Sequence, residues 1–369
     1  MSKQRIWICV IVALAGLISL YFYSTSDMRW DLVSKQFMKS ENNYVYDARN
    51  FRIHENEMIS LRFIDRWDKS KATIHVGSIE NSKQTFSEKA QDGTWWLSPD
   101  WEVIYLSTRR FDEDTDSSSS RNNRTTQTNK LWKSTDGGHH WERLAWPKQQ
   151  RIKAIHFLNE QEGFAIGMKP HIWHTNNGGE DWRDIELPFQ TNSSNTRKAF
   201  DSTTLDKNNT LYLAFAPVGA TEPISEIWRI KQGKTTPEFM FTVPGNEVSS
   251  IFSDDGSDVY VLSVGGSKTE YDQQTSTLYQ WDNKKLNELH SLPTGLRRGD
   301  IDQTPTNKYL LVHGRYNGSN AQDWAALSKN GGKSWHLDKG RSTQGSYYDA
   351  ATGINWSASG HTLYKREFP

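Results

Sequence analysis

Residues 152–185 alternate short apolar runs with polar turns, which is the pattern expected of consecutive strands. The runs at residues 154–157, 163–167, 171–175 and 182–185 are four or five residues long and rich in β-branched and aromatic side chains. Short polar segments separate them. The pattern predicts four successive antiparallel strands, with the first as the inner strand of a unit and the last as its outer strand.

An eight-residue turn motif recurs at the ends of such strands. Residues 134–141 read STDGGHHW, an instance of S-x-D-x-G-x-x-W, and slightly degraded copies read TNNGGEDW at 175–182 and SKNGGKSW at 328–335. An Asp or Asn that opens a tight turn accepts hydrogen bonds from nearby backbone N–H groups, and the Gly pair supplies positive φ. The terminal Trp can cover the edge of a neighbouring unit.

We therefore interpret the motif as a structural staple between two strands. The side chain of the Asp or Asn is occupied in holding the turn, so we do not expect it to be catalytic. The residues expected to build these staples are Ser134, Asp136, Gly138, Trp141, Thr175, Asn177, Gly179, Trp182, Ser328, Asn330, Gly332 and Trp335.

On these motifs the chain resembles the Asp-box (BNR) repeat proteins, which include bacterial sialidases and photosystem II assembly factor-like propellers. The resemblance is densest between residues 134 and 182. It implies an all-β fold, a β-propeller. The first two motifs are 41 residues apart, within the roughly 40–45 residues of one four-stranded blade.

Blade number follows from the short apolar triplets that mark third strands. Their centres stand at 74, 132, 173, 228, 279, 326 and 364, and the excess over one blade falls in polar loops at 111–129, 217–225, 265–276 and 314–322. This predicts seven blades. Six or eight blades remain alternatives, because the strand boundaries within residues 44–89 are poorly marked. All blades are expected in one domain, residues 27–369. A chain of 369 residues with 16 Trp is large enough to bury the core of such a domain.

The last unit has room for only three strands, at 347–350, 354–357 and 362–366. An open ring would expose unpaired strand edges. We therefore expect the N-terminal segment 30–33 to become the fourth strand of the final blade.

The N-terminus predicts a membrane anchor. Residues 6–23 carry no charge and follow Lys3 and Arg5, which is just long enough to span a bilayer with the basic flank in the cytoplasm. No small-x-small cleavage site follows. We expect a cytoplasmic tail at 1–5, a single transmembrane anchor at 6–24, and a signal-anchor that stays uncleaved.

Charge and cysteine content limit the compartment and the partners. Lys plus Arg equals Asp plus Glu at 44 each, so no global field favours nucleic acid. The single Cys9 lies inside the anchor, which leaves the exported domain without disulfides. We expect the propeller to lie in the periplasm of a bacterium, on the inner membrane.

The long loops should all open on one face, opposite the Asp-box turns, and loops on a rigid scaffold commonly bind partners. Arginine and tyrosine are enriched at protein–protein hot spots. The expected partner-binding residues on this face are Arg109, Arg110, Arg297, Arg298, Arg315 and Tyr316.

The alternative is a sialidase-like glycoside hydrolase. Sialidases carry a substrate-binding arginine in a Phe/Tyr-Arg-Ile/Leu-Pro motif, and residues 51–54 read FRIH, without the proline. The resemblance then implies a carboxylate-binding triad of Arg52, Arg298 and Arg315, with Tyr347 or Tyr348 as nucleophile. No Glu or Asp stands in a matching motif, so whether the protein is an enzyme is left open and no catalytic residue is assigned.

No metal or cofactor is expected. His171 and His174 have the wrong spacing to share one face of a strand, and His139 with His140 lies inside a turn. The sequence therefore predicts a membrane-anchored periplasmic propeller that binds another protein. Two roles stay open: a scaffold or assembly factor for a membrane complex, and an immunity protein against a secreted toxin.

Overall fold

A computed structural model describes residues 31–34, 51–64, 70–112, 126–146, 150–167, 171–187, 200–215, 224–245, 247–265, 275–292, 296–303, 310–316, 323–331, 333–339, 345–349, 352–359 and 362–367. Within these residues no helix is long and apolar enough to cross a membrane. The tail and anchor expected at 1–24 lie outside them.

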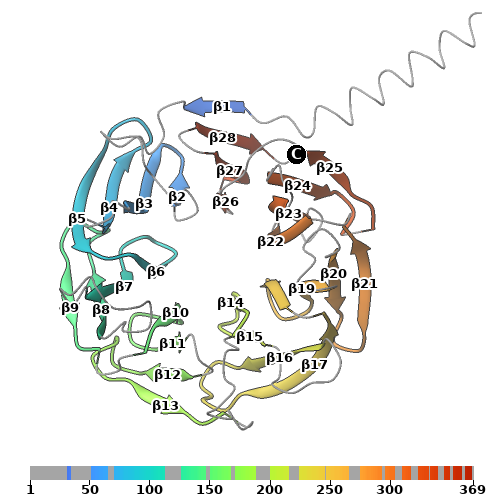
Figure 1. The fold of residues 1–369 in the computed structure, drawn as a ribbon, viewed down its shortest axis with the longest axis horizontal. Coiled ribbons are helices and arrows are strands. Elements are labelled where there is room, and N and C mark those ends of the chain that lie inside the picture. The colour runs from blue at the N-terminus through green and yellow to red at the C-terminus, as the bar shows by residue number, and fades with distance from the viewer. Residues whose placement is uncertain are drawn as a thin grey trace, which may run out of the picture.

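The described strands form seven four-stranded antiparallel sheets arranged as a ring (Figure 1). We call them blades 1 to 7. Blade 1 holds β2 (Phe51–His54), β3 (Glu57–Ile64), β4 (Lys71–Ser78) and β5 (Ser82–Lys89). Blade 2 holds β6 (Asp92–Leu97), β7 (Ile104–Asp112), β8 (Thr126–Ser134) and β9 (Glu142–Leu144). Blade 3 holds β10 (Ile152–Phe157), β11 (Gly163–Gly167), β12 (Ile172–Thr175) and β13 (Arg183–Ile185).

The other four blades follow the same order from inner to outer strand. Blade 4 holds β14 (Ser202–Leu205), β15 (Leu211–Phe215), β16 (Ile224–Ile230) and β17 (Glu238–Pro244), and blade 5 holds β18 (Glu247–Phe252), β19 (Val259–Gly265), β20 (Thr275–Trp281) and β21 (Leu286–Ser291). Blade 6 holds β22 (Leu296–Gln303), β23 (Leu310–Tyr316), β24 (Asp323–Ser328) and β25 (His336–Lys339). Blade 7 holds β26 (Gly345–Asp349), β27 (Ile354–Ser359), β28 (Thr362–Glu367) and β1 (Asp31–Ser34).

The all-β propeller expected from the sequence is confirmed. The blade that the sequence resolves in full is observed as β10 to β13, within two residues of the expected bounds. Each triplet marker, from Ile74 in β4 to Tyr364 in β28, lies in the third strand of its sheet. Second strands such as β11 and β15 are buried at every position because both their faces pack on neighbouring blades, which is why they are apolar throughout.

The ring is closed by the N-terminal strand, as expected. β1 pairs antiparallel with β28, and its Asp31 and Leu32 lie opposite Lys365 and Tyr364. The core lies between the blades: the cluster at the closing seam joins Phe51, Ile53 and Met58 of blade 1 to Trp356, Ala358 and Leu363 of blade 7, with Val33 of β1 packed against it. Closure therefore joins the first and last segments of the chain in one apolar interface.

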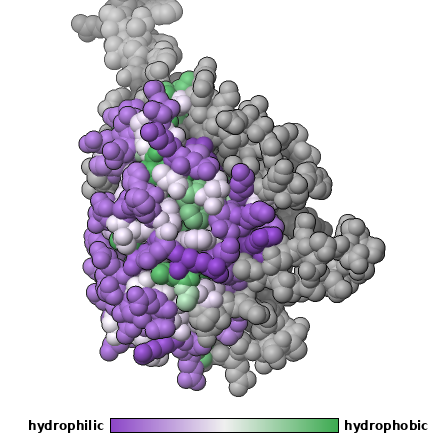
Figure 2. All heavy atoms as spheres, turned by 90° about the vertical axis from the view of Figure 1, so that its left-hand side faces the viewer, coloured by the Kyte–Doolittle hydropathy of each residue, from purple (hydrophilic) through white to green (hydrophobic). Residues whose placement is uncertain are grey.

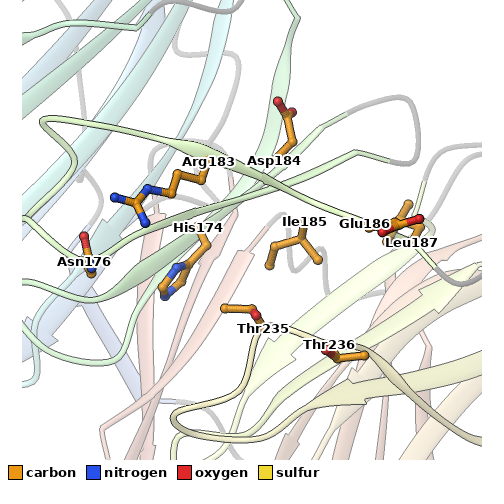
Figure 3. Close-up of a pocket in the computed structure, with 9 residues that line it drawn as sticks. All are labelled: His174, Asn176, Arg183, Asp184, Ile185, Glu186, Leu187, Thr235 and Thr236. Carbon is orange, nitrogen blue, oxygen red and sulfur yellow. The ribbon is translucent and has the colours of Figure 1, made fainter.

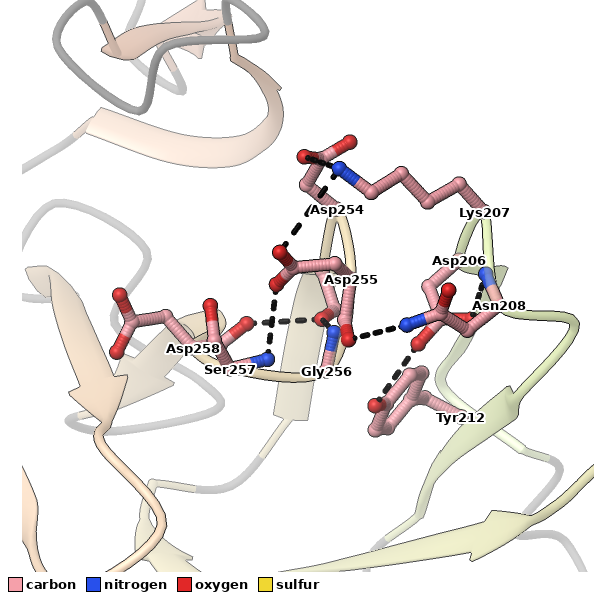
Figure 4. A network of polar contacts seen from close by, with 10 residues as sticks. Asp206, Lys207, Asn208, Tyr212, Asp254, Asp255, Gly256, Ser257 and Asp258 are labelled. Carbon is pink, nitrogen blue, oxygen red and sulfur yellow. Dashed lines mark hydrogen bonds and ion pairs between the residues drawn. The ribbon is translucent and has the colours of Figure 1, made fainter.

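The blades are also joined by polar turns. Between blades 4 and 5, Lys207 Nζ lies 2.8 Å from Asp254 Oδ2, and Asn208 Nδ2 donates to the carbonyl of Asp255 at 2.7 Å (Figure 4). The outer surface of blades 1 and 2 is mostly hydrophilic, with small separate apolar areas (Figure 2). The ring is thus held together by contacts between neighbouring blades and presents a polar exterior on that side.

Candidate functional site at the inner rim

The Asp boxes hold turns. Asp136 Oδ1 accepts hydrogen bonds from Ser134 Oγ at 2.9 Å and from the backbone N–H groups of His139 and His140 at 3.1 and 2.9 Å. Gly138 N donates to Ser134 Oγ at 2.9 Å. The backbone N–H of His140, together with the other donors, holds the pKa of Asp136 well below its usual range. This carboxylate is committed to the turn.

The two degraded boxes use the same contacts. Gly179 N donates to Thr175 Oγ1 at 2.9 Å and Asp181 N to Asn177 Oδ1 at 3.0 Å. In the third box, Ser334 N donates to Asn330 Oδ1 at 2.9 Å and Ser328 Oγ to the same oxygen at 3.0 Å. Gly332 lies outside the described residues.

The box tryptophans cover the preceding blade. Trp141 of blade 2 packs on Phe86 of blade 1 with ring centroids 4.9 Å apart, and Trp182 of blade 3 packs on Trp146, which follows blade 2. Trp335 of blade 6 stacks on His290 of blade 5 at 5.9 Å. The motif therefore joins strands within a blade and blades to each other, at the end of the ring opposite the first residues of the inner strands.

The other end of the ring carries the candidate site. We define the inner rim as Arg52, Asp92, Trp95, Arg109, Arg151, Lys153 and Tyr347, which lie at or near the starts of inner strands or pair with them. Each makes a contact that crosses from one strand or blade to the next.

Arg52 is enclosed by aromatic rings of two other blades. Its Cζ lies 4.8 Å from the centroid of Tyr347 in blade 7 and 5.8 Å from that of Trp95 in blade 2. Its Nη1 donates to the carbonyl of Phe51 at 2.8 Å. Burial raises the pKa of Tyr347, and Arg52 partly offsets that rise. Aromatic faces stabilise a guanidinium by cation–π attraction, so this cation is fixed in place.

Arg109 and Arg151 share one carboxylate. Arg109 Nε donates to Asp92 Oδ1 at 2.8 Å and its Nη2 contacts Asp92 Oδ2, while Arg151 Nη2 lies 2.8 Å from the same Oδ2. Burial lowers the pKa of Arg151; Asp92 raises it and Arg109 lowers it. Among the described residues, this part of the rim therefore places two guanidinium groups on one carboxylate.

Lys153 continues these contacts into blade 4. Its Nζ donates to the carbonyls of Phe200 and Asp201, the latter at 2.6 Å. Asp201 Oδ2 accepts from the backbone N–H of Val248 in blade 5 at 3.3 Å. The sequence analysis missed Asp92, Trp95, Arg151 and Lys153, because only the register of the blades shows that they lie near inner-strand starts.

The residues expected to bind a partner fall into two groups. Arg109 and Arg110 lie at one end of blade 2, and Arg109 is only 15% exposed in its ion pair with Asp92. In blade 6 the register places Arg297 opposite Arg315 and Leu296 opposite Tyr316, with a β-bulge at Arg298. Blades 7 and 1 separate the two groups around the ring. The backbone places both groups at the same end of the propeller.

The structure brings together some of the residues to which the sialidase alternative assigns a role. Arg52 and Tyr347 are in contact, while Arg298 and Arg315 belong to blade 6, where the structure describes the backbone. Asp349, on the same strand as Tyr347, is buried and pairs with His54 Nδ1 at 3.0 Å. In the part of the chain that is described, no three His, Cys, Asp or Glu side chains form a group suited to a metal ion.

A separate cavity of about 530 Å³ lies on the outer rim between blades 3 and 4 (Figure 3). Its wall combines both charge signs with apolar carbons: His174, Asn176, Arg183, Asp184, Ile185, Glu186, Leu187, Thr235 and Thr236. His174 Nε2 is held by Glu162 Oε1 at 3.2 Å. This mixed lining favours no single ligand class.

The ring and its closure define the chain as a β-propeller, and three of its turns carry the Asp-box motif. The family model for the photosynthesis system II assembly factor YCF48 matches residues 95–202. A search of curated proteins finds no significant match.

Solved structures share the fold over nearly the whole chain. "YCF48 bound to D1 peptide" is similar at a TM-score of 0.57 and 13% identity, covering 92% of this chain and 97% of that one. YCF48 from Cyanidioschyzon merolae matches at 0.55 and 11%, covering 92% and 98%. The propeller domain of the Trilobed protease from Pyrococcus furiosus matches at 0.54 and 13%, covering 88% and 96%.

Proposed function

We propose that this propeller binds a segment of another protein at its inner rim and acts as a scaffold or assembly factor. The observation that carries the proposal is the set of cations fixed there: Arg52 between two aromatic rings, and Arg109 with Arg151 around the single carboxylate of Asp92. The peptide complex of the similar YCF48 structure supports a protein ligand for this type of propeller.

The chemistry of the rim favours a ligand segment with carboxylates, from acidic side chains or a free C-terminus. Arginine binds carboxylates through paired N–H donors, and such charge-assisted hydrogen bonds are stronger than neutral ones. Arginines held in place by neighbouring groups lose little conformational entropy on binding. The rim residues come from blades 7, 1, 2 and 3, so a bound segment would contact several blades.

The proposal includes a membrane anchor at residues 6–24 with the propeller in the periplasm. The uncharged run 6–23 after Lys3 and Arg5 supports it. An anchored propeller would meet membrane proteins during their maturation. An immunity protein against a secreted toxin would need the same membrane anchor. Its partner would come from outside the cell and not from the envelope.

The test is affinity capture with the tagged full chain in a non-ionic detergent, from envelope extracts and from culture supernatants. We expect a stoichiometric partner from the envelope; a partner found only in supernatants would favour the immunity role. The captured protein is then expressed separately and titrated. Arg52→Gln with Arg151→Gln should weaken its affinity about tenfold or more, since buried interface arginines commonly contribute over about 1 kcal/mol each.

The matched control is Arg229→Gln, which removes an arginine paired with Glu238 on blade 4, away from the rim. Binding that is unchanged by the double substitution would place the site elsewhere. A fluorogenic sialoside assay on the same preparation tests the alternative: turnover that is lost in Arg52→Ala would make the protein a sialidase.

A further inference from the structure

A buried arginine at the closing seam forms no ion pair with a carboxylate of the described residues. Arg62 of β3 is 5% exposed and shares its sheet face with Met58, which packs against Trp356 and Leu363 of blade 7. Its guanidinium donates only two long hydrogen bonds to neutral groups, Nε to Ser60 Oγ at 3.3 Å and Nη2 to Ser82 Oγ at 3.4 Å. Among the described residues no carboxylate forms an ion pair with it.

The side chains beside Arg62 supply more donors and no anion. Thr73 lies directly opposite Arg62 in the β3–β4 register, and its buried Oγ1 has no hydrogen-bond partner. His75 lies opposite Ser60 on the same face. Burial and the charge of Arg62 lower the pKa of His75 to about 4, so it is neutral at pH 7. The facing blade adds a further buried donor without a partner at this seam, Trp356 Nε1.

Such an arrangement is unfavourable as it stands. A buried charge without a counter-ion loses its hydration without gaining an attractive partner, and a buried hydroxyl without a hydrogen bond adds to the cost. Burial lowers the pKa of Arg62 to about 10, which still leaves the guanidinium charged at neutral pH. A negative charge beside it would remove the imbalance.

We infer that the seam between blades 1 and 7 binds a small monovalent anion, such as chloride or formate, against Arg62 and Thr73. One guanidinium beside a neutral histidine balances one negative charge, whereas a divalent anion would leave one negative charge unbalanced. The guanidinium N–H groups and the Thr73 hydroxyl are the donors that such an anion accepts. The site is distinct from the inner rim and does not depend on the proposed function.

The anion should bind only the folded ring, because the donors come together through the pairing of β3, β4 and β5, on the face of blade 1 whose Met58 packs on blade 7. A ligand that binds only the folded state raises the apparent stability in proportion to the logarithm of its concentration. Anion binding therefore stabilises the seam that β1 closes.

The experiment is thermal unfolding of the full chain in a non-ionic detergent, with sodium gluconate replaced by sodium chloride up to 200 mM at constant ionic strength. We expect Tm to rise by about 2 °C or more in the wild type. Arg62→Met should abolish this rise, and Arg229→Met, which removes an arginine paired with Glu238 on blade 4, should retain it. An equal rise in all three proteins would overturn the inference.

A second measurement covers the case in which Arg62→Met does not fold. Crystals of the wild type soaked in bromide should show an anomalous peak within hydrogen-bonding distance of the Arg62 guanidinium. Thr73→Val, which removes only the orphaned hydroxyl, should reduce the chloride-dependent rise in Tm. A map without a peak at Arg62 would reject the site.

Discussion

Two histidines are held neutral by burial. His156 of β10 lies 2.9 Å from Thr203 Oγ1 through its Nε2, and burial lowers its pKa to about 4. Burial is also the main cause that lowers the pKa of His75 of β4 to about 4. Both values lie below the pKa of about 6.5 that histidine has in an unfolded chain. The unfolded state therefore binds more protons between these pH values, and the folded state loses stability there.

We predict that the free energy of unfolding falls as pH decreases from about 6.5 to about 4, with each such histidine adding at most about 1.4 kcal/mol per pH unit. His156→Gln keeps a group that can bond Thr203 and should make this decrease shallower. His139→Gln is the control, because the His139 side chain is exposed. Chemical denaturation across this pH range measures the slopes; identical slopes for His156→Gln and wild type would contradict the assignment.

At the scale of elements, β1 is the strand on which ring closure depends. Its two central side chains have opposite surroundings: Val33 packs against the closing cluster, whereas Leu32 is 49% exposed. Because strand side chains alternate between faces, this pair separates the effect of the seam from that of the strand itself. Three paired residues, Asp31, Leu32 and Ser34, and the packed side chain of Val33 join the N-terminal segment to blade 7.

We predict that Val33→Asp destabilises the whole propeller by about 2 kcal/mol or more, because it places a charge against an apolar cluster. Leu32→Asp should change stability by less than about 1 kcal/mol, since its side chain faces solvent. Denaturant titration measures both. If the two variants lose equal stability, β1 does not close the ring through Val33.

On the scale of the whole molecule, the positive and negative charges are equal in number but are not evenly distributed over the propeller. The chain carries 44 basic and 44 acidic residues. The described inner rim brings together four cations, Arg52, Arg109, Arg151 and Lys153, of which Arg109 and Arg151 contact the Asp92 carboxylate. A cluster of cations of this kind steers an acidic ligand over short distances. Salt screens such attraction within about 10 Å at 0.1 M.

We predict that the affinity for the captured partner falls several-fold when sodium chloride rises from 50 to 300 mM, mainly through a slower association rate. Surface plasmon resonance measures both rates. The Arg52→Gln, Arg151→Gln variant should show a weaker salt dependence than wild type. A salt-independent association rate would argue against electrostatic recognition at the rim.

The sequence alone determined the features that depend on neighbouring residues. The alternation of apolar and polar positions predicted the strands of blade 3, and the S-x-D-x-G-x-x-W motif predicted the turn contacts of Asp136. The 41-residue spacing and the short last unit predicted the propeller and its closure by the N-terminal strand. These features are local because hydrogen bonds in turns and side-chain alternation in strands span only a few residues.

Only the tertiary structure decided which charges are paired and which are not. Arg109 reads as a partner-binding residue in the sequence, but the ring places it against Asp92, with Arg151 from the next blade on the same carboxylate. Arg62 attracts no notice in the sequence, yet it is buried at a seam where, in the described part of the chain, no carboxylate pairs with it. Contacts between blades join residues as far apart as His54 and Asp349, 295 positions along the chain. Burial and pairing at such distances depend on how the blades pack, and no local pattern encodes them.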